Sequence, residues 1–141
     1  YCINTITKSM GAADFLLGVC ESWMTPALFL SVAFVAGAVI SFFTGSSWGT
    51  FAICIPIAVP MAYSFTGGQL GTLVYAAVGA VVSGGLFGDH CSPVSDTTVL
   101  SSLGAACDHI DHVRTQLPYA LLAAVVSMIL WVVVAMVGGA A

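Results

Sequence analysis

The stretch "GDHCSPVSDTT", Gly88–Thr98, places two carboxylates directly after an apolar run of the chain. Asp89 and Asp96 are accompanied by four hydroxyl side chains: Ser92, Ser95, Thr97 and Thr98. An ionised aspartate near the middle of a membrane costs about 2.5–3.5 kcal/mol, so two such groups need partners that offset the cost. How the chain folds around this stretch therefore depends on what surrounds it.

The composition indicates that lipid is the solvent for much of the surface. Hydrophobic residues make up 60% of the sequence and charged residues 6%, against roughly 25% charged in a soluble domain. The net charge of -4 includes only two basic residues, which excludes nucleic acid as a partner. The five cysteines are odd in number and form no C-x-x-C pair, so neither a disulfide framework nor a zinc knuckle is indicated.

Working outward, two segments are long and apolar enough to cross a membrane, which takes about 20 residues. They are Leu70–Phe87 and Leu117–Val137. The segment Leu28–Phe43 is slightly short, and Phe51–Tyr63 is too short and contains two prolines. The Gly- and Ser-rich loop Thr44–Thr50, "TGSSWGT", joins these two shorter segments. Together they predict a re-entrant helical hairpin. The alternative is an ordinary polar loop between two imperfect spans.

Two arrangements are open for the stretch that contains the aspartates. In an unbroken helix, Asp89, Ser92 and Asp96 would lie on one face, at i, i+3 and i+7. In a broken helix, Pro93 would begin a second half-helix with Ser92 as its N-cap. Three glycines would then mark the break: Gly84, Gly85 and Gly88.

Both arrangements bring the same oxygens together, and oxygen is the ligand that hard cations prefer. A broken helix adds backbone carbonyls that have lost their partners, which transporters use to bind alkali cations. A carboxylate in such a place can also hold a proton when the cation is absent. The structural alternative is that Asp89 and Asp96 cap helix ends at the water interface.

Two stretches resemble a known family of carriers. The run "GDHCSPVSDTTVLSSLGAACDHIDHVRTQLPYALL", Gly88–Leu122, closely resembles the C-terminal half of NhaC-type sodium/proton antiporters, a family that includes malate/lactate-coupled members. The stretch "TGSSWGTFAICIPIAVP", Thr44–Pro60, resembles a second signature of that family. The resemblance implies a non-enzymatic carrier in a bacterial or archaeal cytoplasmic membrane, which moves Na⁺ and H⁺ and needs no cofactor.

The resemblance also implies an architecture and a set of ligands. The wider superfamily has two inverted repeats, each with a re-entrant hairpin and an interrupted helix. The hairpin tip would carry Thr44, Ser46, Ser47 and Thr50. The helix break facing it would carry Asp89, Ser92, Ser95, Asp96 and Thr97.

The expected fold class is therefore an all-α polytopic membrane protein. Residues 1–141 form a single transmembrane domain, expected to be the C-terminal repeat of a longer carrier, with its N-terminal half missing from a sequence that begins with Tyr1. The alternative function is a Na⁺- or H⁺-coupled carrier of an organic acid or an amino acid. Homodimer formation, through the small-residue steps Gly67–Gly71 and Gly84–Gly88, is a further alternative to the missing half.

A second polar cluster follows in "CDHIDHVRTQ", Cys107–Gln116. Its spacing resembles a metal-ligand pattern, which would suit an intramembrane hydrolase, but no H-E-x-x-H motif is present. A solvated connecting loop is the favoured interpretation, and pH sensing by histidine is the remaining one. The residues concerned are Asp108, His109, Asp111 and His112.

Overall fold

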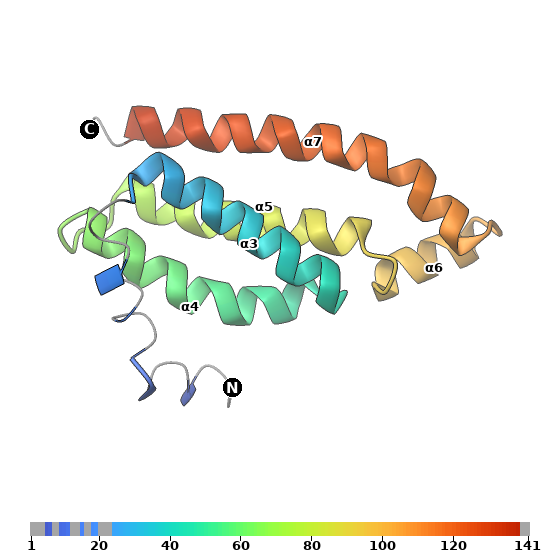
Figure 1. Ribbon diagram of the computed structural model, residues 1–141, viewed down its shortest axis with the longest axis horizontal. Helices are drawn as coiled ribbons and strands as arrows, with labels where there is room; N and C mark the ends of the chain where they lie inside the picture. Colours follow the sequence, from blue (N-terminus) through green and yellow to red (C-terminus); the bar gives the residue numbers. More distant parts are fainter. Residues whose placement is uncertain (1–4, 7–8, 12–14, 16–17, 20–23, 139–141) are drawn as a thin grey trace.

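The computed structural model describes residues 5–6, 9–11, 15, 18–19 and 24–138, and those residues contain no β-strand. The structure is all-helical, as the composition predicts, and four of its helices are long and apolar enough to cross a membrane within the part of the chain that the structure describes. Four elongated helices lie side by side, and a short one lies at one end, next to the longest helix and past the ends of the other three (Figure 1). The protein is therefore a polytopic membrane protein.

Helices α3, Pro26–Thr44, and α4, Ser47–Phe65, form a helical hairpin. Helix α3 ends at Gly45, whose φ of +66° requires glycine and whose N–H donates to the carbonyl of Ser41 (2.8 Å). Ser46 is the N-cap of α4, and its hydroxyl accepts from the N–H of Gly49 (3.3 Å). The loop predicted over seven residues thus shortens to a turn of two.

The second arm of the hairpin is longer than its apolar stretch suggested. Phe51–Tyr63 was too short to cross a membrane, whereas α4 contains 19 residues, the same number as α3. The helix includes the polar tip from Ser47 onward and continues through Pro56 and Pro60. Each arm is long enough to cross a membrane fully. That the hairpin enters and leaves the membrane on the same side therefore stays a prediction.

Helices α5, Thr72–Cys91, and α6, Asp96–Gly104, form the interrupted helix. The chain leaves the helical path between them, which confirms a broken rather than a continuous helix. The break lies between Asp89 and Asp96, as predicted, but the three glycines do not mark it, because they lie inside α5. The predicted N-cap was also wrong, since Ser92 ends α5 and Ser95 precedes α6.

The glycines of α5 let it pack closely against α3. A Cβ on Gly84 would lie 2.1 Å from the carbonyl oxygen of Phe34, and one on Gly88 would lie 2.2 Å from that of Ala38. The step Gly84–Gly88 is therefore occupied within the chain and is not a free dimerisation face. The step Gly67–Gly71 lies in the turn between α4 and α5, with Gly67 and Gly68 at positive φ, and not on a helix face.

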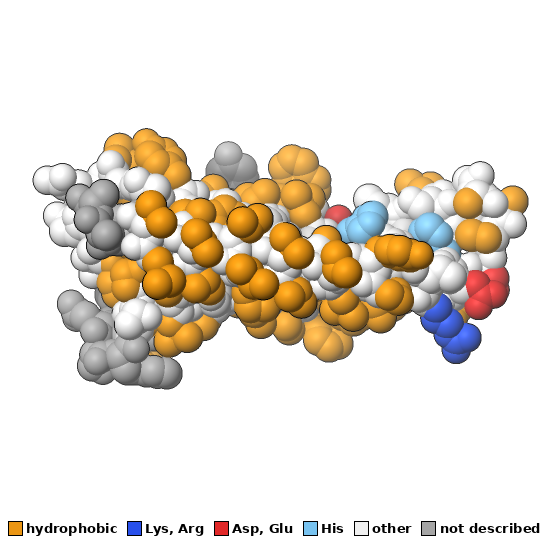
Figure 2. All heavy atoms as spheres, turned by 90° about the horizontal axis from the view of Figure 1, so that it is seen from above, with side chains coloured by type: hydrophobic (Ala, Val, Ile, Leu, Met, Phe, Trp, Pro, Cys, Tyr) orange, Lys and Arg blue, Asp and Glu red, His pale blue; other side chains and the backbone are white. Residues whose placement is uncertain are grey.

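Helix α7, His109–Gly138, lies along α3 and α5 (Figure 1). Trp131 donates from Nε1 to the hydroxyl of Ser83 on α5 (2.9 Å), and its ring covers Gly79. The helix is longer than the predicted Leu117–Val137, because residues 109–116 are helical and not a connecting loop. Exposed apolar side chains cover much of the face seen in Figure 2, where basic and acidic side chains lie together at one end and a further acidic side chain shows nearer the middle.

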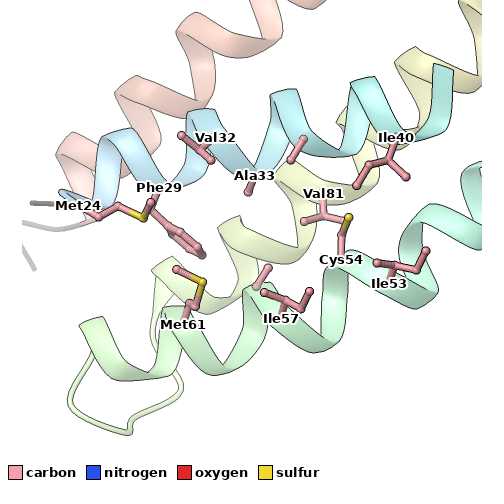
Figure 3. A pocket seen from close by; sticks show the side chains of 12 residues that line it. Met24, Phe29, Val32, Ala33, Ile40, Ile53, Cys54, Ile57, Met61 and Val81 are labelled. Carbon is pink, nitrogen blue, oxygen red and sulfur yellow. The ribbon is translucent and has the colours of Figure 1, made fainter. Parts of the chain in front are cut away.

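Buried apolar side chains of α3, α4 and α5 form most of the core. It includes Leu30, Phe34, Ala62, Ala77 and Val81. Beside it, an apolar groove of about 310 Å³ runs between α3 and α4, with Ile40 and Ile53 near one end and Met24 and Met61 near the other (Figure 3). None of the described residues that line this groove has a charged or hydroxyl side chain, so this lining suits hydrocarbon and not an ion.

Candidate functional site

The site centres on Asp89, in the last turn of α5. Its side chain is buried, with 9% of the residue exposed, and both carboxylate oxygens accept hydrogen bonds from hydroxyls. Ser47, at the start of α4, donates to Oδ2 (3.1 Å), and Ser95, at the break, donates to Oδ1 (2.7 Å). The structure therefore joins the hairpin tip to the helix break through one carboxylate.

A chain of hydroxyls extends from Asp89 to the surface. Ser95 Oγ lies 2.8 Å from Thr97 Oγ1, and Thr97 is exposed. Because the single hydroxyl proton of Ser95 is donated to Asp89, Thr97 is the donor in this second hydrogen bond. The buried carboxylate is thus two hydrogen bonds away from an exposed hydroxyl.

The backbone around the break is held against the hairpin. Ser92, which is fully buried, donates from Oγ to the carbonyl of Phe42 on α3 (2.6 Å). A Cβ on Gly45 would lie 2.8 Å from the carbonyl oxygen of Val94, so the turn of the hairpin contacts the break directly. These contacts fix where Ser47 and Ser95 lie relative to Asp89.

Four predicted ligands lie outside this hydrogen-bonded cluster. Asp96 is exposed, and its Oδ1 accepts from the N–H of the next residue, Thr97 (2.8 Å). Thr44 donates to the carbonyl of Ile40 within α3, and Thr50, although fully buried, donates to the carbonyl of Ser46 (2.9 Å). The hydroxyl of Ser46 caps α4. The structure thus brings together Ser47, Asp89, Ser95 and Thr97, with Ser92 beside them.

Two residues of α7 make hydrogen bonds around the break, and sequence reasoning missed these contacts. His109 lies with Nε2 2.7 Å from the carbonyl oxygen of Pro93 and with Nδ1 3.2 Å from Ser102 Oγ on α6. Gln116 donates from Nε2 to the carbonyl of His90 (2.7 Å). The break is therefore level with the polar first turns of α7, and not with the middle of its apolar stretch.

The second polar cluster, Cys107–Gln116, includes the N-cap and the first turns of α7. Asp108 accepts through Oδ1 from the N–H groups of Ile110 (2.9 Å) and Asp111 (3.2 Å), as an N-cap does. Among the described residues, no group of three or more His, Cys, Asp or Glu side chains is arranged to hold a metal ion. These residues begin a helix instead.

Residues 1–136 match the Na⁺/H⁺ antiporter family. The chain belongs to this family. It is 48% identical over 133 residues to an uncharacterized protein of Haemophilus influenzae, covering 94% of this chain and 25% of the relative. It is 36% identical to the malate-2H⁺/Na⁺-lactate antiporter of Bacillus subtilis (81% and 23% covered) and 32% identical to the Na⁺/H⁺ antiporter NhaC of Alkalihalophilus pseudofirmus (88% and 26%).

The chain spans about a quarter of the length of these curated relatives. No solved structure matches it significantly. Membership of an antiporter family points to a transporter. The predicted resemblance is thereby confirmed.

Proposed function

We propose that the carrier to which this chain belongs exchanges Na⁺ for H⁺ across a bacterial or archaeal cytoplasmic membrane, and that Asp89 binds both ions in turn. The observation that carries the proposal is the buried carboxylate of Asp89, held between Ser47 of the hairpin and Ser95 of the break. Asp89 forms no ion pair with a described residue, and a buried carboxylate that lacks one must be compensated by hydroxyls, by a cation or by a proton.

Binding of the two ions at Asp89 is mutually exclusive. A cation is attracted by the ionised carboxylate and takes further oxygen ligands from the hydroxyls of Ser47 and Ser95. A proton on the same carboxylate removes the charge that attracts the cation. Exchange follows because release of one ion frees the oxygens for the other.

The remaining predicted ligands have supporting roles in this proposal. The exposed carboxylate of Asp96 attracts cations toward the entrance, and Thr97 connects the entrance to Asp89 through Ser95. Ser92 anchors the break to α3. The hydroxyls of the hairpin turn keep its geometry through local hydrogen bonds: Thr44, Ser46 and Thr50.

The whole carrier is part of the same proposal. Because the chain covers about a quarter of its relatives, the rest of the polypeptide is proposed to supply the opposite repeat. Inverted-repeat carriers alternate access by moving one repeat or bundle against another around a central site. The remaining partners are Na⁺, H⁺ and the lipid bilayer.

A second candidate is a carrier that couples these ions to an organic acid. It is favoured by the similarity to a relative named as a malate-2H⁺/Na⁺-lactate antiporter. Counterflow of labelled malate or lactate into proteoliposomes of the full-length carrier distinguishes it from simple cation exchange. Uptake of either acid that depends on a Na⁺ or H⁺ gradient identifies the coupled carrier.

The test of the main proposal is the substitution Asp89→Asn in the full-length carrier. Asparagine keeps the shape of the side chain but cannot exchange a proton for a cation. Everted membrane vesicles with a pH-sensitive dye should show Na⁺-driven proton movement for the wild type and none for the variant. Wild-type rates in Asp89→Asn, at equal protein abundance, would end the proposal.

A further inference from the structure

Two buried side-chain oxygens have no hydrogen-bond partner in the described part of the chain, Ser41 Oγ and Gln116 Oε1. Both belong to residues that border the last turn of α5. Ser41 packs against Gly88, which precedes Asp89, and Gln116 donates its amide N–H to the carbonyl of His90, which follows Asp89. Buried polar atoms without a partner are rare in native proteins and point to an unseen water or ion.

Ser41 is the more informative of the two because it is fully buried. It lies on α3, one helical turn before Gly45, which contacts the break. Its Cβ faces α5, since a Cβ on Gly88 would lie 2.9 Å from it. The carbonyl of the next residue, Phe42, accepts from Ser92. The hydroxyl is thus enclosed between the hairpin and the turn that carries Asp89.

The missing partner of Ser41 is unusual for a serine in an apolar helix. Such hydroxyls ordinarily donate to the carbonyl four residues earlier. Ser31 does so on the same helix, with Ala27 (3.0 Å), and Ser83 does so on α5, with Gly79 (2.8 Å). Ser41 makes no such bond, so both lone pairs and the proton of its hydroxyl are available next to Gly88, the residue that precedes Asp89.

We infer that Ser41 is a further cation ligand of the Asp89 site, an inference that rests on the proposed function. Ser47 and Ser95 donate their hydroxyl protons to the carboxylate while no cation is bound, and must reorient to offer lone pairs to a cation. Ser41 has no existing hydrogen bond to break. Na⁺ binding then supplies the partner that this hydroxyl lacks.

The experiment compares Ser41→Ala with Ser31→Ala in the full-length carrier. Both substitutions remove one hydroxyl from α3, but of the two only Ser41 packs against Gly88, in the turn of α5 that carries Asp89. Ser41→Ala should raise the KM for Na⁺ about five-fold and leave the maximal rate within about two-fold, as expected for one neutral oxygen ligand. It should also reduce the rise in Tm that Na⁺ gives the purified carrier. Ser31→Ala should behave as wild type in both measurements.

A second variant keeps the inference testable if alanine disturbs the packing. Ser41→Cys preserves the volume but replaces a hard oxygen with a soft sulfur, which binds Na⁺ poorly. It should raise the Na⁺ KM as Ser41→Ala does. Unchanged KM and unchanged Na⁺-dependent Tm in either well-folded variant would overturn the inference, and so would a loss of maximal rate with no change in KM.

The two proposals fail in different ways. If Asp89→Asn transports like the wild type, the proposed exchange at Asp89 is wrong. If Asp89→Asn is inactive while Ser41→Ala and Ser41→Cys bind Na⁺ like the wild type, Asp89 still exchanges the ions and only the role of Ser41 is wrong.

Discussion

The close packing of α3 on α5 gives a quantitative prediction for Gly88→Ala. The new Cβ would lie 2.2 Å from the carbonyl oxygen of Ala38, 2.8 Å from the backbone nitrogen of Phe42 and 2.9 Å from the Cβ of Ser41. The first two are backbone atoms, so no side chain can rotate away. The helices must separate by about 1 Å to restore an ordinary contact distance. Overpacking of this kind costs about 1–3 kcal/mol.

The separation also affects the site. The hydrogen bond from Ser47 to Asp89 is 3.1 Å long, and an increase beyond about 3.5 Å breaks it. Ser47 is a proposed cation ligand, and the loss of one neutral oxygen ligand corresponds to about five-fold in ion binding. Gly88→Ala should therefore lower the Tm of the purified carrier and reduce Na⁺-driven proton movement in everted vesicles at least five-fold.

Two matched variants separate packing from site geometry. Gly104→Ala, on α6, places its Cβ in open space and should leave both measurements unchanged. Gly84→Ala, whose Cβ would lie 2.1 Å from the carbonyl oxygen of Phe34, should lower the Tm as Gly88→Ala does. It should impair transport less, because Gly84 lies more than one turn from Asp89. Gly88→Ala that behaves like Gly104→Ala would refute the backbone contact between α3 and α5.

Three further outcomes follow from the site. Asp96→Asn should raise the Na⁺ KM a few-fold and keep the maximal rate, because Asp96 is exposed. A complete loss of vesicle transport would instead mean that Asp96 exchanges ions together with Asp89. Ser47→Ala should raise the Na⁺ KM about five-fold. Thr50→Ala should raise the KM less, since the hydroxyl of Thr50 donates only within the hairpin, and equal KM values for the two variants would contradict this ranking. The 141 residues expressed alone should insert into membranes, and liposomes containing them should show no proton flux under a Na⁺ gradient, whereas sustained flux would identify a complete carrier.

Hydropathy located the apolar part of each of the four long helices, but not the ends of the helices. The start of α7 shows why. Residues 109–116 are polar and were interpreted as a loop, although Asp108 is a good N-cap residue and its carboxylate accepts from two backbone N–H groups. A capping signal was therefore present, but the change in polarity at residue 117 obscured it.

The glycines of α5 show a limit of local rules. Glycine is a poor helix former, so three of them near the aspartates predicted a break. The structure uses them where α3 approaches too closely for any Cβ, which is information that only the tertiary arrangement contains. The break occurs instead around Pro93, where the missing N–H and the ring oppose a continuous helix. The pairing of Ser47 with Asp89, 42 residues apart, required the family resemblance.

The way the interrupted helix restarts connects ion binding to the position of α6. Ser95 is the N-cap of α6, where a serine hydroxyl ordinarily accepts from a backbone N–H of the first turn, yet its side chain makes no such bond and donates to Asp89 instead. When a proton or a cation occupies Asp89, the carboxylate no longer needs that donor. Ser95 is then free to bind the ion or to cap α6, and the hydrogen bond from Thr97 must change with it. In the proposed function, exchange at Asp89 therefore alters the first turn of the second half-helix directly, without any signal passing through the apolar core.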